Sequence, residues 1–185
     1  MKKLFIIPIV LLVGFLFFNI NWEFRPKQDL GTSRRVYLPD PKITPGVLNP
    51  AVTQENLKTT VCVGGWSSKQ RPSVSWTAPR ERESIKQYGY EDTNPSNFEY
   101  DHRVPISLSG APRDTANLWP QKLTGEYNAL MKDRLEYRVY RDLCAGKVTL
   151  KQAQDIFLGD WTKAYDRLEL TFGSMEEAID PDDIE

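Results

Sequence analysis

The sequence predicts an α+β domain, because it combines two long helical patterns with short segments of alternating apolar residues around its only histidine. The helical patterns cover residues 125–147 and 149–170, and the alternating segment covers residues 97–110. The chain has 185 residues, of which 40% are hydrophobic and 26% charged. This length and composition are typical of one folded domain with appendages.

An apolar run occupies the N-terminus. It extends from Leu4 to Ile20 and follows Lys2 and Lys3. Such a segment, residues 1–21, is typical of a signal anchor or a signal peptide, and we expect it to form a hydrophobic helix. The usual small-residue cleavage site is missing, which favours an uncleaved anchor over a removed signal peptide. The lysine pair favours a cytoplasmic N-terminus. We therefore expect an exported domain, either anchored to the membrane outside the cytoplasm or, after cleavage, secreted or periplasmic.

The rest of the chain divides into three parts. Residues 22–45 are rich in proline, glycine and charge, which is typical of a linker. We expect the folded domain at residues 46–172 and an acidic tail at residues 173–185. The two cysteines, Cys62 and Cys144, are too few for a zinc ribbon, so no structural zinc is expected. In an exported protein they would form a disulfide; the alternative is two buried free thiols.

The first predicted elements precede the histidine. A short helix is expected within residues 49–62, with Asn49 as its cap and Pro50 at its first position. A second short helix is expected within residues 80–90 and would end at Gly89. A strand or hairpin arm follows at residues 97–110, where Pro105 suits an edge or a loop.

The later elements are an apolar segment and the two helices. Apolar residues occur again within residues 117–121, where Pro120 ends the apolar segment. The first long helix is expected to end at Gly146. The second is expected to begin with a capping box formed by Thr149 and Gln152.

Asp101 and His102 are the residues with the clearest chemical potential. Histidine titrates near neutrality, so His102 can take a proton from water. A carboxylate such as Asp101 can hold a hard divalent cation, and a base beside a metal is a common arrangement for attack on a phosphodiester. In a regular strand these neighbours would face opposite sides, so the chain must turn there if both serve one site.

The string "DHRVPISLSGAPRDTANLWPQ", residues 101–121, resembles the HNH nucleases, also called His-Me finger or ββα-metal nucleases. Their pattern is Asp-His, apolar residues with a proline, a glycine-containing loop, then Asn-Leu and a helix; residues 128–136 also resemble exported bacterial members. The resemblance implies an α+β fold with a ββα-metal core and additional helices. It also implies a metal-dependent endonuclease acting on DNA, or on RNA. The chain has no evident sequence-reading module, so we expect low sequence specificity.

The resemblance assigns a role to each matched position. His102 would be the general base, and Asp101 would be a ligand of one divalent metal ion, with Mg²⁺ expected and Mn²⁺ as the alternative. Asn117 would fix the loop through its side-chain amide. Asn128 is expected as the third group, a metal ligand on the helix. Lys132, one turn later, would contact the scissile phosphate or stabilise the leaving group.

Basic side chains near the motif are candidates for substrate contact. Arg103 and Arg134 are expected to bind the substrate, although basic residues at helical spacing are also typical of a solvated face. The expected partners are nucleic acid, DNA before RNA, and a membrane through the N-terminal segment; the sequence does not predict an oligomeric state. Each site residue also has a structural alternative: His102 as a surface histidine with a satisfied hydrogen bond, Asp101 as a turn cap, Asn128 as a residue of the first helical turn, and Lys132 as a solvated helix residue.

Two other functions compete with the nuclease. One is a non-catalytic envelope protein that keeps an HNH-like fold for binding, which the net charge of −1 favours. The other is a metal-dependent phosphodiesterase that acts on a smaller substrate.

Overall fold

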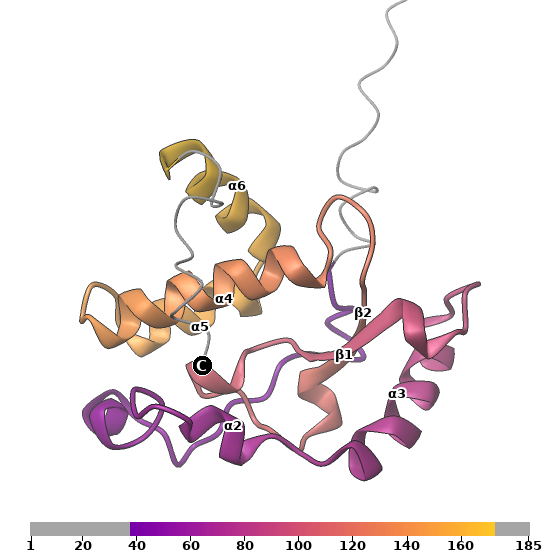
Figure 1. Cartoon of the computed structure of the whole chain (residues 1–185), viewed down its shortest axis with the longest axis horizontal. Coiled ribbons are helices and arrows are strands. Elements are labelled where there is room, and N and C mark those ends of the chain that lie inside the picture. Colours follow the sequence, from indigo (N-terminus) through magenta and orange to yellow (C-terminus); the bar gives the residue numbers. More distant parts are fainter. Residues whose placement is uncertain (1–37, 173–185) are drawn as a thin grey trace, which may run out of the picture.

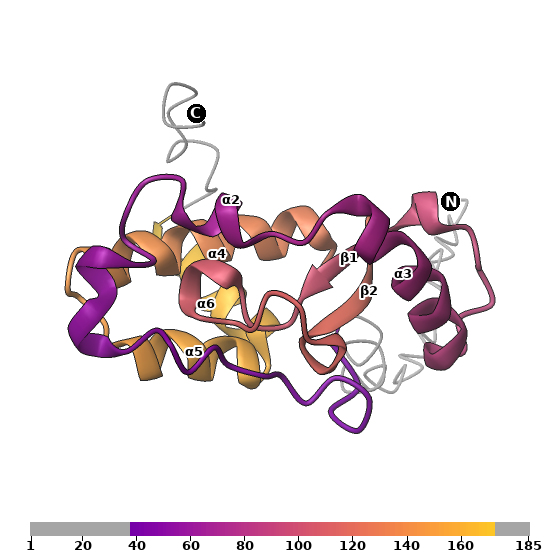
Figure 2. The same cartoon turned by 90° about the horizontal axis from the view of Figure 1, so that it is seen from below.

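The computed structural model describes residues 38–172 and shows helices arranged around a small two-stranded sheet (Figures 1 and 2). The α+β class is therefore confirmed. The N-terminal run, most of the linker and the acidic tail lie outside the described residues. The elements, in chain order, are η1 (Gln54–Thr59), α2 (Trp66–Gln70), α3 (Val74–Tyr88), η2 (Pro95–Asn97), β1 (Phe98–His102), η3 (Ile106–Leu108), η4 (Thr115–Asn117), β2 (Leu118–Lys122), α4 (Ala129–Cys144), α5 (Leu150–Leu158) and α6 (Trp161–Phe172).

Strands β1 and β2 are antiparallel and pair from Phe98 with Lys122 to His102 with Leu118. Two backbone bonds flank the pairing, from Arg103 N–H to Asn117 O and from Leu123 N–H to Asn97 O. Hydrogen-bonded pairs alternate along an antiparallel ladder, so these two bonds make the pair of Tyr100 and Pro120 a non-hydrogen-bonded one. Pro120, which has no N–H to donate, is therefore tolerated inside β2.

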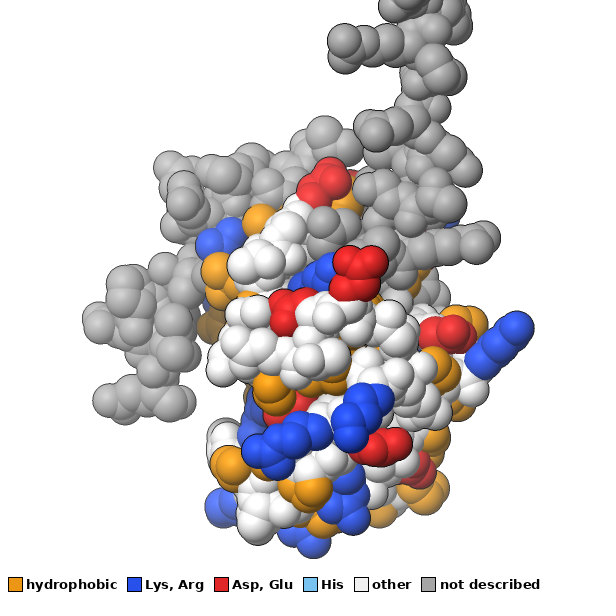
Figure 3. All heavy atoms as spheres, turned by 90° about the vertical axis from the view of Figure 1, so that its right-hand side faces the viewer, with side chains coloured by type: hydrophobic (Ala, Val, Ile, Leu, Met, Phe, Trp, Pro, Cys, Tyr) orange, Lys and Arg blue, Asp and Glu red, His pale blue; other side chains and the backbone are white. Residues whose placement is uncertain are grey.

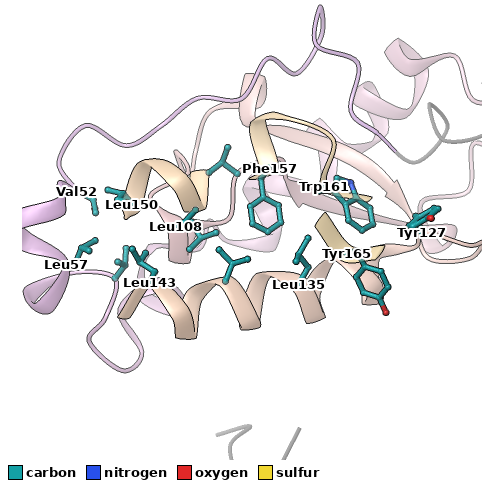
Figure 4. Close-up of a cluster of buried hydrophobic side chains, with 14 residues drawn as sticks. Val52, Leu57, Leu108, Tyr127, Leu135, Leu143, Leu150, Phe157, Trp161 and Tyr165 are labelled. Carbon is teal, nitrogen blue, oxygen red and sulfur yellow. The ribbon is translucent and has the colours of Figure 1, made fainter. Parts of the chain in front are cut away.

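The hydrophobic core lies between α4, α5 and α6 and extends to η3. Each of these three helices packs against the other two, and η3 contacts both α4 and α5. Figure 4 shows side chains of α4 facing those of α5 and α6, with Leu108 of η3 among them. The core consists of Val52, Leu57, Val61, Val104, Leu108, Tyr127, Leu135, Val139, Leu143, Leu150, Ala153, Phe157, Trp161 and Tyr165. The loop that follows β1 is thus built into the core.

Several predicted boundaries differ from the observed ones. The second long helical pattern is two helices, because the chain breaks at Gly159 and Asp160 between α5 and α6. The helix predicted within residues 80–90 begins earlier, at Val74. The helix predicted within residues 49–62 is only the 3-10 helix η1, because the Asn49 side chain accepts the Ala51 N–H in a local turn instead of capping a helix.

Other local predictions are confirmed. Gly89 and Gly146 have φ values of 68° and 72°, the left-handed conformation that favours glycine at a helix end. Thr149 and Gln152 form the expected capping box at the start of α5. Within residues 38–172, none of the helices combines the length and the hydropathy of a membrane span.

The cysteines form the predicted disulfide. The Cys62–Cys144 bond has an S–S distance of 2.00 Å and a Cα–Cα distance of 5.5 Å, and it joins the segment after η1 to the end of α4.

A second long-range contact involves Thr44, inside the predicted linker. Its side chain is buried, its hydroxyl lies 2.7 Å from the Tyr88 hydroxyl, and its carbonyl accepts a hydrogen bond from Arg103. The end of the predicted linker, residues 22–45, is therefore in contact with the folded domain at Thr44.

Candidate functional site

His102 ends β1 and is held by one side-chain hydrogen bond. Its Nε2 lies 3.1 Å from the Pro112 carbonyl oxygen, and the side chain is largely buried. A carbonyl oxygen can only accept, so Nε2 carries the proton and the lone pair of the neutral ring is on Nδ1. Nδ1 forms no hydrogen bond with the part of the chain that the structure describes. Burial lowers the pKa of His102, although the Pro112 carbonyl and the Asp101 charge act in the opposite direction. The lowered pKa favours the neutral ring, which is the form that a general base needs.

Asn117 fixes the loop that connects β1 to β2, as the resemblance implies. Its amide oxygen accepts the Val104 N–H at 3.0 Å, and its amide nitrogen donates to the carbonyls of Val104 and Ala111 at 3.0 and 3.2 Å. Gly110 is required at the same place, because a Cβ there would lie 1.7 Å from the Val104 carbonyl oxygen. The loop thus brings Pro112 to the His102 ring.

Lys132 of α4 lies at the centre of a buried charge cluster. Its ammonium donates to Asp101 Oδ2 at 2.5 Å, to the His102 carbonyl at 2.8 Å and to Glu136 Oε1, so all three N–H groups have acceptors. Burial alone would lower the pKa of Lys132, but the Asp101 and Glu136 carboxylates raise it above its usual value. Only 1% of the residue is exposed. Lys132 therefore faces the domain interior in this structure and holds Asp101 and the His102 carbonyl. Its contact with a scissile phosphate stays a prediction.

Asn128 caps α4. Its side-chain oxygen accepts the Met131 N–H at 3.1 Å, and its amide nitrogen donates to the Gly125 carbonyl at 3.2 Å. The first N–H groups of a helix have no partner within the helix, which explains why an asparagine is favourable here. Both polar groups of the Asn128 side chain are thus used at the start of the helix, which fits the alternative of a residue in the first helical turn. Its role as a metal ligand stays a prediction.

The two arginines expected to bind substrate lie in different surroundings. Arg103 is buried, and its guanidinium donates to the carbonyls of Thr44 at 2.6 Å, Phe157 at 3.3 Å and Leu158. These bonds connect the start of the β1–β2 loop to α5 and to Thr44, so the Arg103 side chain has a structural role. Arg134 lies half-buried on α4, and its substrate contact stays a prediction.

Two further carboxylates, those of Glu99 and Asp133, lie near Asp101, and neither is among the positions to which the resemblance assigns a role. Glu99 is two residues before Asp101 on the same face of β1. Burial, followed by the negative charges of Asp101 and Asp133, raises the pKa of Glu99 to about 7. Partial burial and the charge of Asp101 also raise the pKa of Asp133. The alternation of side chains along a strand could have indicated from the sequence that Glu99 lies on the same face as Asp101. The position of Asp133 becomes clear only from the path of α4 in the structure.

Gln121 is the cross-strand partner of Glu99 and lies on the same face of the sheet. Its side chain is buried, and neither its amide oxygen nor its amide nitrogen has a hydrogen-bond partner among residues 38–172. Carboxylate and amide oxygens are chemically suited to Mg²⁺. However, no three His, Cys, Asp or Glu side chains in residues 38–172 lie close enough together to hold a metal ion. Both Asp101 oxygens also accept hydrogen bonds, one from the His102 N–H at 2.7 Å and one from Lys132. The residues as they stand therefore do not fit a ready-made metal site.

Comparison of the chain with protein-family models, curated proteins and solved structures found no match. Function must therefore be inferred from the site and from the motif in residues 101–121.

Proposed function

We propose that the protein is an endonuclease of the HNH type that hydrolyses phosphodiester bonds in DNA with low sequence specificity. RNA is the second candidate substrate. The observation that carries the proposal is the state of His102: a neutral imidazole at the end of β1, with Nε2 fixed by a carbonyl and the Nδ1 lone pair unused. The order β1, loop, β2, α4 and the loop-fixing Asn117 support it.

The reaction assigns one proton transfer to His102. Nδ1 takes a proton from water, the water oxygen forms a bond to phosphorus, and the phosphorus–oxygen bond to one nucleotide breaks. The departing oxygen takes a proton from solvent. Lys132 and Asp101 do not enter this step. They hold the His102 backbone, so that the ring is positioned before the substrate binds.

A divalent cation, Mg²⁺ or Mn²⁺, remains part of the proposal. Its candidate ligands are the carboxylates of Glu99, Asp101 and Asp133, which would have to move closer together to hold it. Export, with the N-terminal segment as anchor or signal, also remains part of the proposal. The disulfide supports export, because such bonds persist mainly in oxidising compartments.

The second candidate function is a non-catalytic binding protein. The observation that favours it is that the Lys132 ammonium lies 2.5 Å from Asp101 Oδ2, so one oxygen of this carboxylate is already engaged by a buried cation. A nuclease that has lost activity could keep the same loop, because Asn117 and Gly110 determine the loop without reference to catalysis.

The experiment that separates the two uses the purified full-length chain and supercoiled plasmid DNA. Nicking is followed with Mg²⁺, with Mn²⁺ and with a chelator, in parallel with His102→Ala and His102→Gln proteins purified in the same way. We expect nicking by the parent, its loss in the chelator, and a loss of at least about a hundredfold in both variants. Circular dichroism verifies that the variants are folded. Absence of nicking by the parent with both metals would refute the nuclease proposal, and equal nicking by His102→Ala would show a contaminant or a different base.

A further inference from the structure

The segment that contains α2 and α3 is basic, unlike the chain as a whole. Residues 66–88 carry five Lys or Arg and two Glu, a net charge of +3, whereas the whole chain has a net charge of −1. Figure 3 views the side of the molecule on which α3 lies and shows Lys and Arg side chains gathered over the lower half of this face. This face therefore carries a group of cationic side chains.

Four of these side chains are exposed: Lys69, Arg71, Arg82 and Lys86. We call them the α2–α3 basic face. None of the four forms an ion pair with another residue between 38 and 172. By contrast, the fifth, Arg80, covers the Trp76 ring at 4.1 Å and donates to the Trp76 carbonyl at 2.7 Å. The four charges on this face are thus available to an anionic partner.

The basic face adjoins the candidate site. Helix α2 packs against η3, which begins four residues after His102, and Arg71 is the C-cap residue of α2. The positive charge of Arg71 acts on His102, Glu99 and Asp133. Arg71 is therefore the residue of the basic face that lies nearest to the candidate site.

We propose that the α2–α3 basic face binds the phosphate backbone of duplex DNA and directs it toward His102, with Arg71 at the site end. The inference rests on the proposed nuclease function and identifies where its substrate lies. Helix α3 has 15 residues and is therefore about 22 Å long, which matches roughly six base-pair steps of one strand. Arg82 and Lys86 are one turn apart on it and face the same side.

An anionic membrane is the other polyanion that such a face could meet, and the structure favours DNA. Helices that lie on membranes expose large apolar side chains opposite the basic ones. On α3, Val74 is the exposed large hydrophobic residue, and it lies at the first position of the helix. Membrane binding would also not explain why the basic face lies beside His102.

The test measures binding apart from cleavage, in full-length protein that carries His102→Ala. Affinity for a labelled DNA duplex is measured by fluorescence anisotropy from about 50 to about 200 mM salt. The first variant adds Arg82→Gln and Lys86→Gln. The matched control adds Lys58→Gln and Lys151→Gln, which remove the same charge from η1 and from the start of α5, at the opposite end of the molecule from α3 (Figures 1 and 2).

We expect the α3 variant to bind at least tenfold more weakly than the control. We also expect its plot of log affinity against log salt to be shallower by about 1.8, because each phosphate contact contributes about 0.9 to the slope. Equal affinities and slopes in the two variants would overturn the inference. So would tight binding to vesicles that contain anionic lipid without binding to DNA. A parent protein that binds through this face but does not nick would refute the proposed function alone.

Discussion

Replacing Lys132 by methionine tests the buried charge cluster, because methionine keeps most of the side-chain volume and removes the ammonium. The change leaves the Asp101 and Glu136 carboxylates close together without their shared cation and leaves the His102 carbonyl without a donor. Breaking a buried ion pair by removing one partner costs about 3–5 kcal/mol. Lys132 is 1% exposed, so solvent cannot replace its interactions, and we expect a loss within this range. This is a large part of the roughly 5–15 kcal/mol that stabilises a typical domain.

The assay is urea unfolding followed by circular dichroism, with the disulfide intact, at pH 5 and pH 8. Burial raises the pKa of Glu136 to about 8 even with the ammonium present, and Lys132→Met removes the positive charge that lowers this pKa, so the pKa of Glu136 is higher still in the variant. A carboxylic acid with a raised pKa in the folded state loses stability as the pH rises through that pKa. The deficit of Lys132→Met should therefore be larger at pH 8 than at pH 5. Adding Glu136→Gln should recover about 1–3 kcal/mol at pH 8, because it removes one of the two unpaired charges. A loss below about 1 kcal/mol, or no recovery by the second change, would refute this description of the cluster.

Three smaller experiments test other parts of the molecule. Gly110→Ala should destabilise the fold by about 3 kcal/mol or more in urea unfolding, because a Cβ would lie 1.7 Å from the Val104 carbonyl oxygen; near-parental stability would contradict this. Replacing both cysteines by serine should lower the free energy of unfolding by about 4.5 kcal/mol in the chain-entropy model for a separation of 82 residues, and an unchanged midpoint would contradict it. If the protein nicks DNA, the acid limb of its pH–rate profile should lie below pH 6.5, because burial lowers the pKa of His102; a limb above pH 7 would exclude His102 as the base.

The local structure was largely predictable from the sequence where short-range patterns determine it. The helix ends at Gly89 and Gly146 follow from glycine conformation, and the start of α5 follows from the Thr149–Gln152 capping box. Boundaries that depend on packing were not predictable. The break between α5 and α6 divides one continuous apolar pattern, and only the arrangement of both helices on α4 shows why the chain turns at Gly159.

Of the candidate site, only the residues within the motif of residues 101–121 were predictable from the sequence. The motif indicated Asp101, His102 and the loop-fixing role of Asn117, because these lie within one short string. The residues contributed by α4 were not predictable, because Asn128 and Lys132 are one turn apart and the sequence does not say which of them faces the sheet. The structure places Lys132 inward on Asp101 and uses Asn128 as the helix cap. The spacing shows that Asn128 and Lys132 share one face of the helix. It does not show which way this face points, because that depends on the length of the connection from β2.

The burial of charge around the motif also changes what Asp101 does for His102. Asp101 Oδ1 accepts the His102 N–H at 2.7 Å, and Lys132, bound to Asp101 Oδ2, donates to the His102 carbonyl at 2.8 Å. Both backbone polar groups of His102 are therefore held by one ion pair, while its ring is held separately by the Pro112 carbonyl. The neighbouring acid and base need not face the same side to serve one site, because the acid acts through the backbone of the base. Because groups of the protein alone hold the backbone and the ring of His102, the position of the base and the binding of a metal can be tested by separate experiments.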